Sequence, residues 1–170
     1  PMGVISATKQ YSLFDNVSTI FALIGISLPS FFMGLLLMKW FAVDMHVFPV
    51  SGMVSAGQNF KGFKLLSDVA YHMFLPCVVI TLINVASLVR YVRMSMLEVI
   101  KQDYIRTARS KGLKEKVVIY KHALRNGMIP VVTILGMSIG GLFSGAVITE
   151  QIFAWPGIGK LTVTSINDRD

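Results

Sequence analysis

Apolar and charged residues occur in separate blocks along this chain. Three stretches contain no Asp, Glu, Lys or Arg: Asn16–Met38, Val69–Val89 and Asn126–Thr149. Each is at least 21 residues long, and about 20 mostly apolar residues suffice for a helix to cross the ~30 Å hydrocarbon layer. The pattern therefore predicts an all-α integral membrane protein with three complete spans, over residues 16–41, 69–93 and 126–149.

The segments between these spans predict the rest of the layout. Residues 44–68 are rich in turn formers and predict an external loop, and residues 150–170 predict a second external segment. Pro29 is expected to kink the first span, and Asp15 or Asn16 is expected to cap its start. The odd number of spans and the polar end of the chain suggest a fragment, so the 170 residues are interpreted as one partial transmembrane domain.

Composition and charge add an orientation. Apolar residues make up 54% of the chain and charged residues 15%, where a soluble domain has about 25% charged residues. The whole net charge of +7 comes from Arg90–Arg125, which holds ten basic and three acidic residues. The positive-inside rule places this segment and the N-terminus in the cytoplasm, and the C-terminus outside. A basic block can also bind nucleic acid, but its place between two spans makes that partner unexpected.

Several small or polar residues lie inside the predicted spans. Asn84 and Ser87 need hydrogen-bond partners at membrane depth, either in another helix or in a passage that they line. The third span carries a row of glycines that allows close approach of another backbone, for packing or for a gate: Gly136, Gly140, Gly141 and Gly145. The single cysteine, Cys77, and three scattered histidines predict no disulfide framework and no metal site.

The cytoplasmic segment 94–122 is patterned beyond what a connector needs. Leu97, Ile100, Tyr104 and Ala108 recur at helical spacing and predict one apolar face. Asp103 is expected to cap a short helix, and Gly112 is expected to end it in a left-handed conformation. The apolar ridge fits either anionic lipid headgroups or a groove on a cytoplasmic partner.

The residues of this segment resemble the signature loop of permease subunits in binding-protein-dependent ABC importers. Arg106-Thr107-Ala108 stands where that loop has Glu-Ala-Ala, and Gly112 keeps the spacing. The usual Ile-x-Leu-Pro is missing, since the next proline is Pro130. This variant is similar to the first, or B-type, permease of the oligopeptide/dipeptide/nickel branch, as are two further motifs: Phe48-Pro49-Val50-Ser51-Gly52 and Glu150-x-Ile152-Phe153-x-Trp155-Pro156-Gly157-Ile158-Gly159.

The resemblance implies a type I ABC importer transmembrane fold in a bacterial or archaeal cell membrane, with the first spans and the last span missing from this fragment. It implies that segment 94–122 contains the coupling helix, which docks on an ATP-binding subunit. The residues expected to form it are Asp103, Tyr104, Ile105, Arg106, Thr107, Ala108, Arg109, Ser110, Lys111 and Gly112.

The same resemblance implies the partners and the activity. Expected partners are a second homologous permease, two ATP-binding subunits, an extracytoplasmic solute-binding protein and membrane lipid. The chain has no phosphate-binding loop, so it is expected to bind no cofactor and to catalyse nothing, while ATP and Mg²⁺ are used by the partner subunits.

Peptides are the expected substrate. Nickel chelates, glutathione or another solute are alternatives within the family, and a non-transport structural membrane protein is an alternative outside it. A membrane-embedded enzyme is disfavoured, because the spans offer only His72 and Cys77 as reactive side chains.

Overall fold

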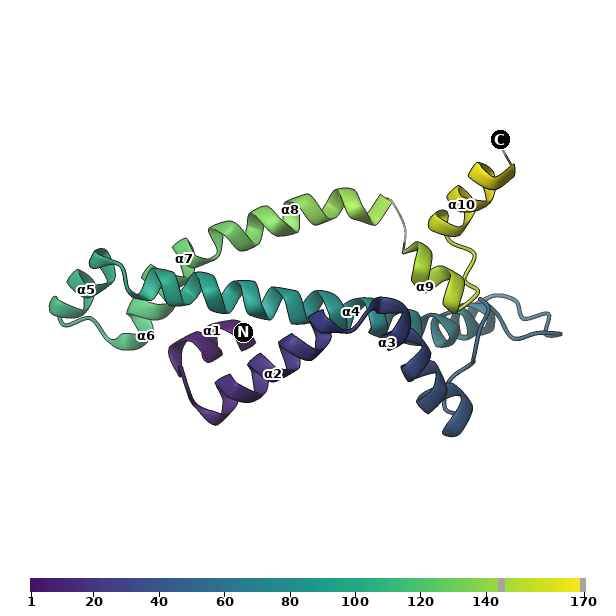
Figure 1. Cartoon of the computed structure of the whole chain (residues 1–170), viewed down its shortest axis with the longest axis horizontal. Helices are drawn as coiled ribbons and strands as arrows, with labels where there is room; N and C mark the ends of the chain where they lie inside the picture. Colours follow the sequence, from purple (N-terminus) through teal and green to yellow (C-terminus); the bar gives the residue numbers. More distant parts are fainter. Residues whose placement is uncertain (144–145, 169–170) are drawn as a thin grey trace. The chain divides into compact units, whose positions relative to one another are not determined.

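The computed structural model describes residues 1–143 and 146–168, and every regular element within them is a helix (Figure 1). The described chain divides into two compact units. The first contains Pro1–Ser27 and Asn84–Ser138, and the second contains Leu28–Ile83 and Ile139–Asp170. The long helix α4, Phe63–Ile100, contributes to both units. The predicted all-α class is confirmed for these residues.

The first unit is built around the second half of α4. Its other elements are α1 (Met2–Thr8), α2 (Leu13–Ser27), α5 (Asp103–Ser110), α6 (Glu115–Val117), the π-helical η2 (Val118–Ala123), α7 (Leu124–Gly127) and most of α8 (Ile129–Phe143). One core cluster draws residues from α1, α4, α5 and η2. Its buried members are Val4, Ala7, Met96, Ile105, Ala108, Val118, Ile119 and Ala123.

The second unit surrounds the first half of α4. It adds α3 (Ser30–Leu37), the π-helical η1 (Met38–Asp44), α9 (Val147–Ile152) and α10 (Ile158–Asp168). Its core cluster contains Leu37, Ala42, Leu75, Val79 and Phe153. The irregular segment between η1 and α4 is tied to this core, because the Gly52 N–H donates a 2.8 Å hydrogen bond to the Phe153 carbonyl.

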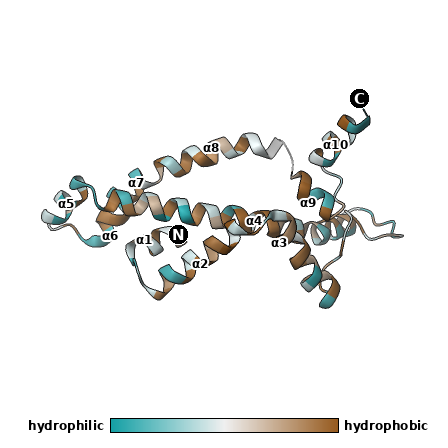
Figure 2. Ribbon diagram, viewed as in Figure 1, coloured by the Kyte–Doolittle hydropathy of each residue, from teal (hydrophilic) through white to brown (hydrophobic). Residues whose placement is uncertain are grey.

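The charge-free stretches lie mainly in α2, α3, α4 and α8, whose residues Figure 2 colours by hydropathy. Among the residues that the structure describes, α4 is the single helix long and apolar enough to cross a membrane by itself, and residues 69–93 lie inside it. Two further spans are counted only if bent helix pairs are joined: Leu13–Ser27 with Ser30–Asp44, and Glu115–Gly127 with Ile129–Gly141. The predicted boundaries at the membrane surface stay predictions.

The first predicted span differs from expectation at Pro29. Instead of one kinked helix over residues 16–41, α2 ends at Ser27 and α3 begins at Ser30. Pro29 has an extended ψ of 143° as the residue before α3. Proline lacks an N–H and disfavours helical geometry in the residue before it, so the helix breaks here rather than bends.

The start of α2 was also predicted wrongly. The helix begins at Leu13, and the Ser12 hydroxyl oxygen accepts a 3.2 Å hydrogen bond from the Asp15 N–H. Ser12 thus occupies the capping position, and Asp15 lies in the first turn. Neither Asp15 nor Asn16 caps the helix.

The motif that follows the third predicted span folds around Glu150. Its carboxylate accepts hydrogen bonds from the Ala146 N–H at 3.1 Å and from the Lys160 N–H at 2.7 Å. A Cβ at Gly157 would lie 2.3 to 2.5 Å from that carboxyl group. Glycine is needed there because the acid held between α9 and α10 occupies the space of a side chain.

Candidate functional site

Helix α5 is the element that carries the predicted signature residues. Gln102 precedes it with an extended backbone (φ −68°, ψ 151°) and makes no side-chain cap bond. Asp103 occupies the first turn rather than the cap, which corrects its expected role; its carboxylate lies 3.6 Å from the Arg106 guanidinium. Lys111 follows the helix, and Gly112 has φ +75°. This φ confirms the predicted left-handed glycine, because glycine adopts such a conformation without strain.

The apolar side of α5 is buried within this chain. Ile105 is fully buried and Ala108 nearly so, in the cluster shared with α1, α4 and η2. The continuous ridge predicted from Leu97 to Ala108 does not form, because α4 ends at Ile100 and α5 starts at Asp103. The prediction that this ridge enters a partner's groove, or lies on lipid headgroups, is therefore wrong for Ala108, which is buried in the cluster, while Tyr104 of the same predicted face is exposed. The predicted face left out Ile105, the most buried residue of α5, which is covered by the chain's own helices.

Side-chain hydrogen bonds connect two residues of α5 to neighbouring segments of its unit. The Asn126 amide donates a 2.8 Å hydrogen bond to the Tyr104 hydroxyl oxygen. Arg109 donates two hydrogen bonds, of 2.7 and 3.1 Å, to the Glu115 carboxylate at the start of α6. Hydrogen bonding to Glu115 raises the pKa of Arg109 above its usual value, so this guanidinium stays charged. These contacts fix the orientation of α5 in its unit.

The face of α5 opposite the buried one is polar. At 100° per residue it consists of Asp103, Arg106, Thr107 and Ser110, and all four are exposed. The Thr107 and Ser110 hydroxyls donate to carbonyls one turn earlier in the same helix, at 3.0 and 3.1 Å. Arg106 projects from this face with 74% of its side chain exposed. The surface that α5 offers to another molecule is therefore short, rigid and polar, with exposed Lys111 and Gly112 at its end.

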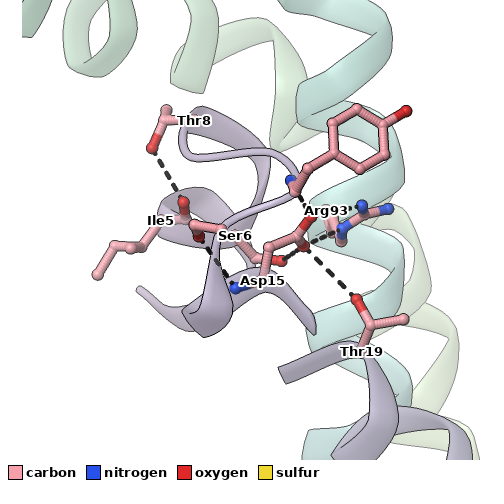
Figure 3. A network of polar contacts seen from close by, with 8 residues as sticks. Ile5, Ser6, Thr8, Asp15, Thr19 and Arg93 are labelled. Carbon is pink, nitrogen blue, oxygen red and sulfur yellow. Dashed lines mark hydrogen bonds and ion pairs between the residues drawn. The ribbon is translucent and has the colours of Figure 1, made fainter. Parts of the chain in front are cut away.

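A buried polar network lies beside this core (Figure 3). The Asp15 carboxylate accepts hydrogen bonds from Arg93 Nε at 2.6 Å and Nη2 at 2.9 Å, from the Tyr11 N–H at 2.9 Å, and from the Ser6 hydroxyl. Asp15 is 1% exposed. The network joins α1, α2 and α4 in one arrangement, as Figure 3 shows.

This network was not predicted from the sequence. Asp15 and Arg93 each flank a different charge-free stretch, on the side predicted to be cytoplasmic. Because both residues are predicted on the same side of the membrane, the sequence could have suggested that this acid and this base form an ion pair. Because α1 also places Val4 and Ala7 in the cluster beneath α5, the network and α5 are attached to the same helices.

The remaining predicted residues lie away from α5. Asn84 is exposed on α4, and Ser87 is half-buried. Gly136, Gly140 and Gly141 are exposed on α8, and no described atom lies within 4 Å of the Cβ position that each would have. Gly145 lies outside the described residues. Roles for these residues in a pathway or a helix interface stay predictions. Within residues 1–143 and 146–168 no three His, Cys, Asp or Glu side chains are grouped to hold a metal ion.

Comparison with known proteins identifies the family. Residues 1–170 match the family described as binding-protein-dependent transport system inner membrane component. The chain is 44% identical over 170 residues to the oligopeptide transport system permease protein AppB of Bacillus subtilis, covering 100% of this chain and 52% of that protein. It is 42% identical over 187 aligned residues to the dipeptide transport system permease protein DppB of Escherichia coli K12, covering 100% of this chain and 55% of the relative.

A third relative has a related name. The di/tripeptide transport system permease protein DppB of Pseudomonas aeruginosa is 42% identical over 182 aligned residues, covering 99% of this chain and 54% of that protein. The chain thus spans about half the length of the curated relatives it matches. The resemblance stated from the signature residues is confirmed, including the B-type oligopeptide/dipeptide branch and the type I ABC importer fold. This chain belongs to the family of binding-protein-dependent transport system inner membrane components.

Proposed function

We propose that this chain is part of the permease of an ATP-driven importer, that it helps to form the translocation path for peptides, and that it couples to an ATP-binding subunit through α5. The observation that carries this proposal is the match over the whole chain to permeases named for oligopeptides and dipeptides. The exposed polar face of α5 supplies the docking surface.

The packing beneath α5 suits it to transmit movement. A packed core responds to displacement as a unit rather than by deforming locally. Ile105 and Ala108 interlock with residues of α1, α4 and η2, so a partner that moves α5 also moves these helices. Helix α4, which is 38 residues long, contributes Met96 to this cluster near its C-terminal end. ATP-driven closure of the partner subunits would thereby rock the membrane helices between two states.

ATP chemistry belongs to other subunits in this proposal. The sequence contains no Gly-x-x-x-x-Gly-Lys-Ser/Thr loop, so we expect ATP and Mg²⁺ to be bound by two ATP-binding subunits. A second homologous permease would complete the pathway, and an extracytoplasmic solute-binding protein would deliver the ligand. This chain would bind no cofactor.

In the orientation that we propose for this chain in the membrane, α5 lies in the cytoplasm. The +7 charge of Arg90–Arg125 supports this through the positive-inside rule. Pro1 would then be cytoplasmic, and the segment 44–68 and the C-terminus external. Single cysteines at Lys114 and Ser55, introduced with Cys77 changed to serine, should react with impermeant reagents from opposite sides of the membrane. Labelling from the same side would reject this topology.

Uptake by the reconstituted complex tests the substrate. The complex should accumulate radiolabelled di- or oligopeptide only with ATP and its binding protein, and unlabelled peptide should compete. Nickel chelates and glutathione, assayed in parallel, represent the alternatives within the family. Accumulation of one of these solutes without peptide uptake would change the proposed substrate and leave the proposed importer function unchanged. If ATP does not increase the accumulation of any of these solutes, the proposal of an ATP-driven importer is contradicted.

A further inference from the structure

A cavity in the first unit lies between α2 and α4. Its volume is about 250 Å³. One part of its wall is apolar, formed by Ala22, Leu23, Val89 and Met94, and the other part is polar, formed by Ser18, Thr19, Arg90 and Arg93. Helix α2 presents its two hydroxyl residues one turn before its apolar ones, so the lining changes from polar to apolar along the helix.

The two arginines of this cavity have different surroundings. Arg93 is matched by Asp15, with a 2.6 Å ion pair. Arg90 forms no ion pair with any carboxylate of the described residues. The cavity therefore carries one uncompensated positive charge, supplied by Arg90.

Arg90 is exposed and lies near the cytoplasmic end of the predicted span. It follows directly on the charge-free stretch Val69–Val89 and comes almost one helical turn before Arg93. A cation at the margin of the hydrocarbon layer is costly unless it is hydrated or paired with an anion. A ligand that supplies a negative charge there would remove this cost.

We propose that this cavity binds the headgroup of an anionic phospholipid, with its phosphate on Arg90 and the neighbouring hydroxyls, and its acyl chain along Leu23 and Val89. A guanidinium binds phosphate by charge-assisted hydrogen bonds, and the hydroxyl of Thr19 adds a further polar group. The volume holds a phosphate and the adjoining glycerol, while the acyl chains extend into the bilayer. A free phosphate would leave the apolar wall uncovered, whereas a phospholipid matches both parts.

The location fits the cytoplasmic leaflet. In the proposed orientation the Arg90 end of α4 is cytoplasmic, and that leaflet carries the anionic lipids that basic pockets between membrane helices recognise. The inference depends on that orientation but not on the transported solute. Lipid binding is measured without ATP or peptide, so its failure is distinguishable from failure of the proposed transport function.

Native mass spectrometry of the assembled permease complex tests the site. The complex is exchanged into nanodiscs of phosphatidylcholine mixed with phosphatidylglycerol, and the lipids retained after release are identified. We expect retained phosphatidylglycerol in the unmodified complex. Arg90→Gln should lower its occupancy about tenfold, as expected for loss of one charge-assisted hydrogen bond. Arg90→Lys, which keeps the charge, should retain most of the binding.

Two further variants separate this site from general attraction to the basic surface. Lys101→Gln removes the same charge at an exposed position just beyond α4 and should leave the retained lipid unchanged. Leu23→Trp fills the apolar part of the cavity without changing charge and should also reduce phosphatidylglycerol occupancy. Equal losses with Lys101→Gln and Arg90→Gln would overturn the proposal. So would full retention in Arg90→Gln, or a crosslink showing that another helix of the complex occupies the cavity.

Discussion

Asp15 and Arg93 are joined by two hydrogen bonds of 2.6 and 2.9 Å, although 78 residues separate them in the sequence. The pair holds the first turn of α2 against α4. It lies next to the helices that carry the core beneath α5, because α1 contributes both Ser6 to the Asp15 network and Val4 to that core. The polar network and the apolar cluster therefore fix the same helices from two sides.

Removing the charge of Asp15 should destabilise this arrangement. Asp15→Asn keeps the shape of the side chain but leaves the Arg93 guanidinium without its counter-ion. Breaking one side of a buried ion pair costs about 3–5 kcal/mol, and we expect the lower end, about 3 kcal/mol, because 23% of the Arg93 side chain is exposed. Thermal unfolding of the assembled complex should show a lower melting temperature.

The matched control for this variant is Asp44→Asn. Asp44 pairs with Lys39 at 2.6 Å, but 46% and 66% of the two side chains are exposed. An exposed ion pair contributes about 0–1 kcal/mol, so this change should be nearly silent. Equal melting temperatures for the two variants would contradict a structural role for the Asp15–Arg93 pair.

Truncation of Ile105 should loosen α5. Ile105 is fully buried in the cluster, and Ile→Ala changes at such positions cost about 2–5 kcal/mol. We expect Ile105→Ala to increase amide hydrogen exchange throughout α5, while exchange in α9 stays unchanged. Val117→Ala, at a residue that is 37% exposed, serves as the control. If α5 amides exchange equally slowly in both variants, the cluster does not hold the helix.

The glycines of α8 predict a contact with another helix of the complex. Within the described chain a Cβ at Gly140 meets nothing, so Gly140→Leu should leave folding and insertion of this chain unchanged. If a second permease or another helix of the complex packs on this face, the added side chain should weaken assembly. Crosslinking yields and co-purification of the second permease measure this. Leu135→Phe, at an exposed residue on the side of α8 away from these glycines, is the control, and an assembled, active Gly140→Leu complex would place this face against lipid.

Much of the fold was predictable from the sequence because charge is excluded from the hydrocarbon layer. The stretch Val69–Val89 identified the core of α4, and the left-handed Gly112 was correctly placed by its position after an apolar pattern. At Pro29 the sequence predicted a kink, whereas the helix ends and a new one begins at Ser30. A proline alone does not reveal whether a helix bends or stops. Ser12 was missed as a cap for a similar reason, since Asp15 is an equally good capping residue by type.

The site was less predictable than the fold. Hydrophobic periodicity placed Ala108 on an apolar face but grouped it with the exposed Tyr104 instead of the buried Ile105, and periodicity does not say which molecule covers a face. The Asp15–Arg93 pair joins residues far apart in the chain, and no local pattern specifies such a contact. The surface that we propose for docking is the polar face of α5 that stays exposed while Ile105 and Ala108 are buried.

The measurement that tests the account most directly is stimulation of ATP hydrolysis by the loaded binding protein, in a reconstituted complex that carries Gly112→Val. Gly112 has φ +75°, where a β-branched residue is strongly disfavoured. Gly112→Asn is the matched control, because asparagine tolerates this conformation. If α5 is the coupling helix, Gly112→Val should insert normally but lose stimulated hydrolysis, or release the ATP-binding subunits, while Gly112→Asn keeps most of the stimulation. Full stimulation with Gly112→Val, with the ATP-binding subunits still bound, would contradict coupling through α5.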